Sequence, residues 1–346
     1  MTRARRIIRA RAPVRIDFAG GWSDVPIFAA AEGGVVTNAA IDLYVHVECI
    51  LGGGTIRLRA EDLRQQLTVS APEQLVYDGH LDLHKAALNM LPLTGGIEIL
   101  TRSDVPPGSG LGASGALDVA LLAALAKGRD EQYDAEQLAE LGYQLEAIEL
   151  GLQGGRQDQY GAALGGWHEL GFGGAGVDIR RIPMSVAQAD ELAGMLVIAF
   201  TGQTHFSSQT HDRVWDAYEG DRAETVAALR AIRDLGTEAG AALRAADWRR
   251  LAEVVDENWR QQQRLDATIS TPAVQRVERA MRAAGAWGIK ATGAGAGGCL
   301  LAIAPPGDVP AVRRAVTEAG ARVLPARFDT EGISVWEEED AAGSGA

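Results

Sequence analysis

Apolar and polar residues alternate along two segments near the start of the chain. In residues 12–19 and again in residues 41–49, every second residue is apolar. This is the pattern of a strand with one buried face, and it sets Arg15 on the opposite face of the first strand. Three glycines at 52–54 then allow a turn into residues 55–58, so we expect these segments to form a β-hairpin. The early chain is therefore predicted to be rich in strands.

A glycine-rich turn joins a short apolar segment to a long one in the middle of the chain. Residues 96–100 (G-I-E-I-L) predict a strand, and residues 116–126 are apolar all round except for Asp118, which is typical of a buried helix. Glycines let backbone N–H groups approach a phosphate, and a helix N-terminus adds unpaired donors. This order predicts an anion-binding loop made of Pro107, Gly108, Ser109, Gly110, Leu111, Gly112, Ala113, Ser114 and Gly115.

The loop differs from the two common phosphate-binding loops. It lacks the G-K-[ST] ending of a P-loop, and no acidic residue follows about twenty positions later, as a dinucleotide-binding fold requires. Ser114 stands where the helix should begin, so its hydroxyl could cap the helix or bind a metal held by the phosphates. A tight turn with a serine cap is the alternative to an anion site.

The rest of the chain alternates helical and strand patterns. We predict a helix over 135–150, a strand over 196–200, three long amphipathic stretches up to residue 284, two strands over 289–292 and 299–304 joined by a second glycine-rich loop, a helix over 309–319, and strands near 323 and 333. The pattern is interrupted near residue 185. The predicted domains are therefore 1–185 and 186–346.

Composition narrows the class of protein. Of the 346 residues, 47% are hydrophobic, which is ample for a core, and the net charge of −13 argues against nucleic acid or an anionic membrane surface as a partner. Cys49 and Cys299 form no metal or redox motif. The basic start lacks the apolar stretch of a signal peptide, and no segment is long enough to span a bilayer. We expect a cytoplasmic protein.

Four motifs together resemble those of the GHMP kinases. P-P-G-S-G-L-G-A-S-G-A is similar to their phosphate loop and K-A-T-G-A-G-A-G-G-C to their third motif, whereas A-P-V-R-I-D-F-A-G-G-W-S-D and G-G-R-Q-D-Q-Y-G-A-A-L-G-G resemble the sugar kinases that act on L-fucose or D-glycero-D-manno-heptose 7-phosphate. The resemblance implies an α+β fold of two domains, a ribosomal protein S5 domain 2-like N-terminal domain with a left-handed crossover and a ferredoxin-like C-terminal domain. It also implies ATP, Mg²⁺ and a sugar bound between them, and a homodimer is one expected assembly.

The resemblance assigns roles to individual residues. Asp158 matches the carboxylate that orients or deprotonates the sugar hydroxyl, and Arg15 matches the arginine paired with it. Ser114 matches the serine that binds Mg²⁺. Glu146, twelve residues before Asp158, fits the metal-binding glutamate, although Glu149 stands one turn further along the predicted helix.

The substrate side is implied in the same way. Asp24 matches the acidic residue that hydrogen-bonds sugar hydroxyls, and Trp22 could stack on a sugar ring or pack between domains. The full set of expected substrate-binding residues is Gly21, Trp22, Ser23, Asp24, Gln157, His205, Gly293, Ala294 and Gly295.

Three positions depart from the family pattern. Ala113 replaces a serine or threonine, which matters little while Ser114 remains, but His205 replaces an arginine and Gln263 stands near a position usually held by lysine. Since a phosphate prefers fixed cations, we expect a neutral sugar or cyclitol, phosphorylated at its anomeric hydroxyl, with heptose 7-phosphate as the alternative. A kinase of a small isoprenoid or amino-acid alcohol and a sugar-sensing regulator without turnover also stay open.

Overall fold

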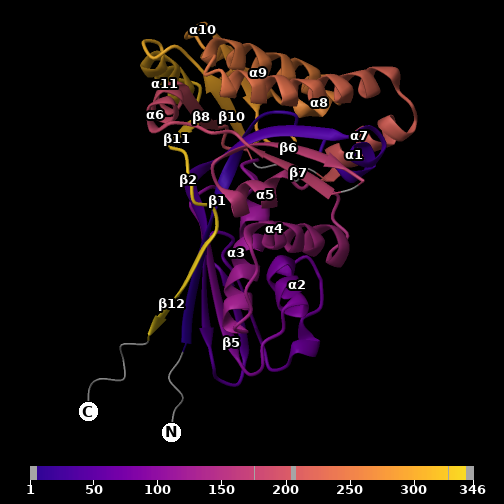
Figure 1. Cartoon of the computed structure of the whole chain (residues 1–346), viewed down its shortest axis with the longest axis vertical. Helices are drawn as coiled ribbons and strands as arrows, with labels where there is room; N and C mark the ends of the chain where they lie inside the picture. Colours follow the sequence, from indigo (N-terminus) through magenta and orange to yellow (C-terminus); the bar gives the residue numbers. More distant parts are fainter. Residues whose placement is uncertain (1–5, 175, 204–207, 326, 340–346) are drawn as a thin grey trace.

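The computed structural model describes residues 6–174, 176–203, 208–325 and 327–339. These residues form two sheets with their helices, and the smaller sheet lies beyond one end of the larger one along the long axis of the molecule (Figure 1). None of the helices in these ranges combines the length and the apolar character needed to cross a membrane.

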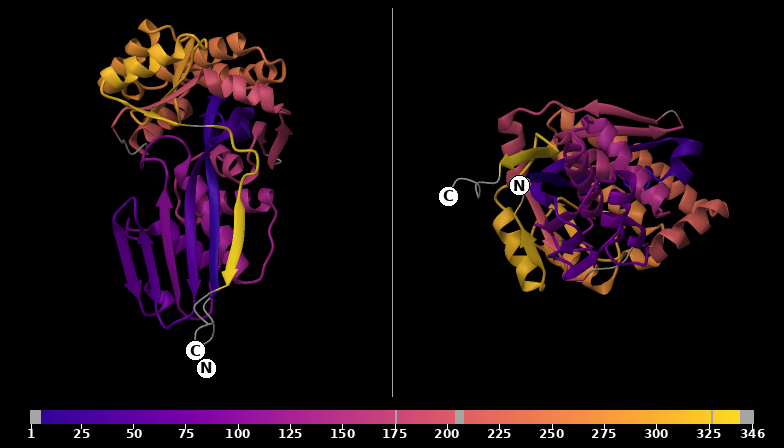
Figure 2. Two further views of the ribbon diagram at one scale, coloured as in Figure 1. Left: turned by 90° about the vertical axis from the view of Figure 1, so that its left-hand side faces the viewer. Right: turned by 90° about the horizontal axis from the view of Figure 1, so that it is seen from below.

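The larger sheet carries most of the early chain. Its strands are β1 (Arg6–Ala19), β2 (Gly34–Leu51), β3 (Ile56–Ala60), β4 (Gln65–Val69), β5 (Ile97–Ser103), β6 (Trp167–Gly173), β7 (Gly176–Arg181) and β12 (Ser334–Glu339). The order is β12-β1-β2-β5-β3-β4, with β6 paired to β2 and to β7, and only the β3–β5 pair among the described strands is parallel. Figure 2 shows this sheet face-on in its left-hand view, with β12 along one side.

The predicted hairpin between residues 41–49 and 55–58 is wrong. β5 lies between β2 and β3, so these two strands do not pair with each other. The physical reason is burial. Ile97 and Ile99 of β5 are almost fully buried and fill the centre of the sheet, whereas Arg57 and Arg59 of β3 are exposed and suit a place near its edge.

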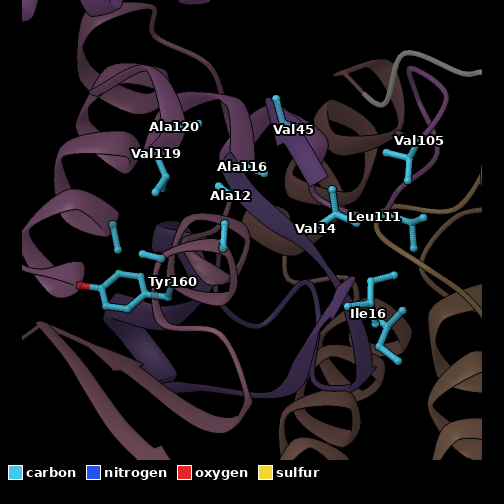
Figure 3. Close-up of a cluster of buried hydrophobic side chains, with 14 of the residues drawn as sticks. Ala12, Val14, Ile16, Val45, Val105, Leu111, Ala116, Val119, Ala120 and Tyr160 are labelled. Atoms are coloured by element: carbon cyan, nitrogen blue, oxygen red, sulfur yellow. The ribbon is translucent and has the colours of Figure 1, made fainter. Parts of the chain in front are cut away.

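Helices cover one face of this sheet: α2 (Asp82–Met90), α3 (Ala113–Gly128), α4 (Ala135–Gln144) and α5 (Gln157–Leu164). Figure 3 shows part of this core, where Ala12 of β1 lies beside Ala116 of α3, and Val14 of β1 lies beside Leu111 in the loop before α3. The predicted helix over 135–150 is regular only to Gln144 and then widens into a π-helical turn, Leu145–Glu149. Such turns are frequent at functional sites. Two shorter elements are α1 (Pro26–Glu32) and the 3₁₀ turn Pro72–Gln74.

The smaller sheet has the strand order of a ferredoxin-like fold. Its strands are β8 (Leu196–Phe200), β9 (Gly288–Ala291), β10 (Cys299–Ile303) and β11 (Arg322–Leu324), arranged β11-β8-β10-β9 and all antiparallel. Its helices are α6 (Val186–Met195), α7 (Ser208–Glu219), α8 (Ala223–Arg244), α9 (Trp248–Gln263), the 3₁₀ turn Ala267–Ile269, α10 (Pro272–Ala283) and α11 (Val309–Glu318). The predicted pair of strands around the second glycine-rich loop and the α+β class are confirmed.

The end of the described chain returns to the larger sheet. β12 pairs antiparallel with β1, from Arg6 opposite Glu339 to Arg11 opposite Ser334. The predicted boundary near residue 185 falls between β7 and α6 and stays a prediction, but β12 lies by its pairing in the sheet of the first predicted domain.

Candidate active site

Arg15 and Asp158 form an ion pair beneath the glycine-rich loop. Arg15 lies on β1 and is only 3% exposed, because α5, α8 and α9 also pack against this strand. The strand is thus buried on both faces at this point, and the expectation of one solvent-facing side is wrong. Nε and Nη2 of Arg15 donate to the same oxygen of Asp158, Oδ1, at 2.8 and 2.6 Å, while Nη1 donates to the Gly110 carbonyl at 2.7 Å. The second carboxylate oxygen is left to accept a hydrogen bond from a ligand.

The loop itself is built on left-handed glycines. Gly108, Gly110 and Gly112 have φ of +68°, +74° and +76°, which only glycine adopts without strain. Gly112 occupies the N-cap position of α3, and Ser114 lies exposed in the first turn. Ser114 is therefore not the cap, and its hydroxyl lowers the pKa of the Glu146 carboxyl.

The second glycine-rich loop packs on the first. The Cys299 N–H donates to the Ser109 carbonyl at 2.8 Å, and a Cβ on Gly293 would lie 3.0 Å from the Gly110 carbonyl oxygen. A Cβ on Gly295 would instead lie 2.7 Å from the Ile269 side chain. Of the residues expected on the substrate side, Gly293, Ala294 and Gly295 thus belong to a loop that packs against the phosphate loop.

Glu146 and Ser114 form a second group beside Asp158. Glu146 comes from the π-helical turn and accepts a hydrogen bond from Gln159 Nε2 at 2.9 Å. Burial raises the pKa of the Glu146 carboxyl, and the negative charge of Asp158 raises it further. Glu149, the alternative, is exposed and accepts from the Tyr77 hydroxyl. The geometry thus groups Glu146, and not Glu149, with Ser114.

Asp118 lies behind this group. It is the single acidic residue in the apolar part of α3 and is fully buried. Burial raises its pKa well above the ordinary value, and the neighbouring Glu146 charge acts in the same direction. The charge of Asp158 thus acts on both Asp118 and Glu146. Within the described ranges, no three His, Cys, Asp or Glu residues form a metal site by themselves.

Asp24 lies at the start of α5, next to the residue that precedes Asp158. It is 3% exposed, and its Oδ2 accepts the Gln157 N–H at 3.1 Å, which ties the G-G-W-S-D turn to the start of α5. Burial raises the Asp24 pKa to about 6, and the Asp158 charge adds to this effect. Gln157 is also buried, and its Oε1 has no hydrogen-bond partner among the described residues.

The remaining residues of the G-G-W-S-D turn hold it together. Ser23 is fully buried, and its hydroxyl hydrogen-bonds the Gly20 carbonyl and accepts the Val35 N–H. A Cβ on Gly21 would lie 3.0 Å from Gln157 Nε2, so the turn and α5 approach each other closely here. Trp22 is 5% exposed and stacks on His211 of α7. Ser23 thus stabilises the turn from within, whereas Asp24 is the residue of the turn whose carboxylate reaches the start of α5.

His205 and Gln263 are the two positions where a cation of the family pattern is replaced. His205 is outside the described residues. The Gln263 amide, at the end of α9, donates to Glu278 and Ser270 at 3.4 and 3.5 Å, within the smaller half of the molecule.

Sequence reasoning missed three polar residues around the site. His211 carried no motif, and Lys290, inside the third motif, forms an ion pair with Asp17 in which both side chains are 1% exposed. Asp118 did give a signal, because it interrupts an otherwise apolar helix.

Comparisons with known proteins identify the family. A model of the GHMP kinases N terminal domain matches residues 76–166, and a model of the GHMP kinases C terminal region matches residues 239–322. A D-glycero-alpha-D-manno-heptose 7-phosphate kinase of Campylobacter jejuni is 29% identical over 340 residues, 96% of this chain and 99% of that protein. A bifunctional fucokinase/GDP-fucose pyrophosphorylase of Arabidopsis thaliana is 29% identical over 86% of this chain, which spans 30% of that larger protein. Among solved structures, a D-glycero-D-manno-heptose 1-phosphate kinase from Bacteroides thetaiotaomicron matches with a TM-score of 0.80 at 27% identity, covering 96% of this chain and all of that one.

The two domain matches and the fold define a class. The chain belongs to the GHMP kinase family, and it has the two-domain fold of that family. Within the family it is an ATP-dependent sugar kinase, in agreement with the two heptose kinases that match 96% of this chain. Mevalonate kinases match as much of the chain at 28% identity. The expected kinase chemistry and fold are thus confirmed, and the alternative of a regulator without turnover is set aside.

Proposed function

We propose that this kinase phosphorylates the anomeric hydroxyl of an unphosphorylated sugar or cyclitol, with a fucose-like hexose as the first candidate. The observation that carries the proposal is the row of Asp24, Asp158 and Arg15, in which Asp158 is fixed by Arg15 through one oxygen only. A carboxylate held in this way can accept the proton of a sugar hydroxyl while its orientation stays constant.

In the proposed reaction the sugar hydroxyl oxygen attacks the γ-phosphorus of ATP. The bond from that phosphorus to the β,γ-bridging oxygen breaks, ADP leaves, and the hydroxyl proton passes to Oδ2 of Asp158. Arg15 holds Asp158 in a fixed orientation before the reaction, through its two hydrogen bonds to Oδ1. The N–H groups at the start of α3 would receive the phosphate oxygens.

The residues present fit a magnesium ion. Glu146 and Ser114 offer the oxygen ligands that Mg²⁺ prefers, and its usual protein share is only one or two ligands with the nucleotide phosphates supplying others. When bound there, the ion would neutralise phosphate charge during transfer. Its positive charge would also offset the mutual repulsion of Asp118, Glu146 and Asp158.

Charge around Asp24 supports a substrate without a phosphate group. Among the described residues, Arg15 is a cation that acts on Asp24, and it is already bonded to Asp158. Arg156 and Arg213, on the elements that carry Asp158 and His211, pair with Glu140 and Asp266. A neutral ring needs no further cation, and the buried Asp24 carboxylate is suited to accept hydrogen bonds from hydroxyls.

A heptose 7-phosphate is the second candidate, because a relative with that substrate in its name matches 96% of this chain. The test is kcat/KM for L-fucose, related neutral sugars, myo-inositol and D-glycero-D-manno-heptose 7-phosphate at equal ionic strength. We expect a neutral compound to be preferred. A preference for the heptose phosphate above tenfold, about 1.4 kcal/mol, would contradict the proposal.

We also propose a cytoplasmic location, which suits an ATP-dependent enzyme with two free cysteines. A homodimer stays a prediction, and its test is the mass of the protein in solution.

A further inference from the structure

We propose that His211 is a sugar-binding residue, whose imidazole lies flat on Trp22 and donates a hydrogen bond from Nε2 to a hydroxyl of the acceptor sugar. This inference rests on the proposed function, since it assigns a new contact within the same sugar site.

The first observation is the position of His211 relative to the G-G-W-S-D turn. His211 lies on α7, far in sequence from the G-G-W-S-D turn, yet its ring stacks on Trp22 with centroids 4.5 Å apart and planes inclined by 25°. Trp22 is two residues before Asp24 in that turn. The charge of Asp158 also reaches His211 and favours its protonated form. The stack therefore joins α7 to the turn that carries Asp24.

The second observation is how firmly the stack is held. Trp22 has φ of +88°, a backbone conformation that a bulky residue rarely adopts and that costs on the order of 1–3 kcal/mol. Such a conformation persists only where the surroundings determine it. Here Trp22 packs with Phe28 and Trp215 in the core of the smaller half of the molecule, and Trp215 lies 5.8 Å from it. The indole thus gives His211 a fixed support.

The third observation concerns the two ring nitrogens. Nδ1 of His211 is enclosed and has no hydrogen-bond partner among the described residues, and His211 as a whole is only half-buried. An enclosed N–H without a partner costs about 1–3 kcal/mol, so the proton of the neutral ring belongs on Nε2. Burial lowers the His211 pKa against the opposing charges of Asp212 and Asp158, and the neutral ring is accordingly the form to consider near neutral pH.

These three features give the proposed sugar site both hydrogen-bond acceptors and a donor. The Asp24 and Asp158 carboxylates accept hydrogen bonds, and the Nε2–H of His211 donates one. A neutral N–H suits a hydroxyl oxygen, whereas a phosphate group is bound best by charged donors. The pocket is thus matched to a ring that carries hydroxyls and no phosphate near α7.

The test compares the parent with His211→Phe and His211→Gln as full-length proteins. Phenylalanine keeps a ring on Trp22 but has no donor, and glutamine keeps an N–H donor without the aromatic ring. His46→Phe is the matched control, since His46 lies on β2 and pairs with Asp104. For each protein, KM for ATP, KM and kcat for the best acceptor, and the melting temperature are measured. The acceptors are L-fucose, D-mannose, D-galactose and D-glycero-D-manno-heptose 7-phosphate, followed by the monodeoxy derivatives of the best one.

We expect His211→Phe to raise the sugar KM about 5- to 10-fold, the worth of one neutral hydrogen bond. KM for ATP and the melting temperature should stay near the parent values, and His211→Gln should recover part of the loss. At one hydroxyl position, removing that hydroxyl should weaken the parent but not His211→Phe.

An unchanged sugar KM in His211→Phe, or equal discrimination of every deoxy sugar by parent and variant, would overturn the inference and leave His211 as a packing residue. If the heptose phosphate is the best acceptor, the proposed neutral substrate is wrong, and the same comparison made on that compound still decides the role of His211. A parent that phosphorylates no acceptor would overturn both proposals.

Discussion

A methyl group at Gly115 would test the mechanical link between the phosphate loop and Asp158. Gly115 lies in the first turn of α3, where an added Cβ would be 2.7 Å from Asp158 Cβ and 2.9 Å from the Gln159 backbone nitrogen. Neither atom is the free end of a flexible side chain. The start of α5 must therefore move, and Asp158 moves with it relative to Arg15 and Glu146.

The expected effects on stability and on rate differ in size. Alanine is favoured over glycine in a helix by about 0.8–1 kcal/mol, and crowding of this kind costs about 1–3 kcal/mol, so Gly115→Ala should lose only about 0–2 kcal/mol of stability. A displacement of the reacting groups by about 1 Å costs about 10²-fold in rate. We therefore expect kcat to fall by about two orders of magnitude in a protein that remains folded.

The assay is ADP release under saturating ATP and sugar, together with thermal melting. Gly194→Ala is the matched control, because Gly194 lies inside α6 and no atom is within 4 Å of the added Cβ. The control should keep the parent's kcat and gain up to about 1 kcal/mol of stability. A Gly115→Ala enzyme with kcat within a few-fold of the parent would refute the idea that the packing of α3 on α5 positions Asp158.

The geometry of the site leads to three further predictions. Ser114→Ala should raise the Mg²⁺ concentration needed for half-maximal rate while apo thermal stability stays unchanged, because Gly112 and not Ser114 is the helix cap; a lower melting temperature with unchanged Mg²⁺ dependence would contradict this. Folded Asp24 keeps its proton up to pH about 6, whereas an ordinary aspartate releases it near 3.8, so the free energy of unfolding should decrease as pH rises between these values, and urea titrations should find this slope missing in Asp24→Asn. Lys290→Met should destabilise the protein by about 3–5 kcal/mol, since it leaves the Asp17 carboxylate buried without its partner; a loss below about 1 kcal/mol in denaturant titration would be the contrary result.

Local patterns in the sequence were sufficient to predict many of the individual strands and helices. The alternation in residues 12–19 and the apolar run of 116–126 correctly predicted β1 and α3, because each pattern reports burial along a single element. The place of β5 between β2 and β3 could not be predicted in this way. Pairing between strands depends on which apolar face competes best for the centre of the sheet, and this is not a property of one segment.

In the candidate active site, too, local sequence predicts single elements but not the contacts between residues far apart in the chain. The glycine-rich loop could be predicted as a turn leading into a helix from its own residues, but Arg15 and Asp158 are separated by 143 positions, and only the family resemblance suggested that they meet. The π-helical turn that carries Glu146 has no clear sequence signal, since its residues are ordinary helix formers. His211 was missed because a single histidine in an amphipathic helix is uninformative until its stacking on Trp22 is known.

The central claim is that Asp158 performs the proton transfer, and Asp158→Asn tests it most directly. The substitution is nearly isosteric, and an asparagine oxygen can still accept from Arg15, so calorimetric affinities for ATP and for the sugar should remain within a few-fold of the parent. The rate of phosphoryl transfer in a single turnover should fall by about 10²- to 10⁴-fold, the usual contribution of a positioned base. A variant that binds both substrates and transfers the phosphoryl group within a few-fold of the parent rate would show that Asp158 is not the base.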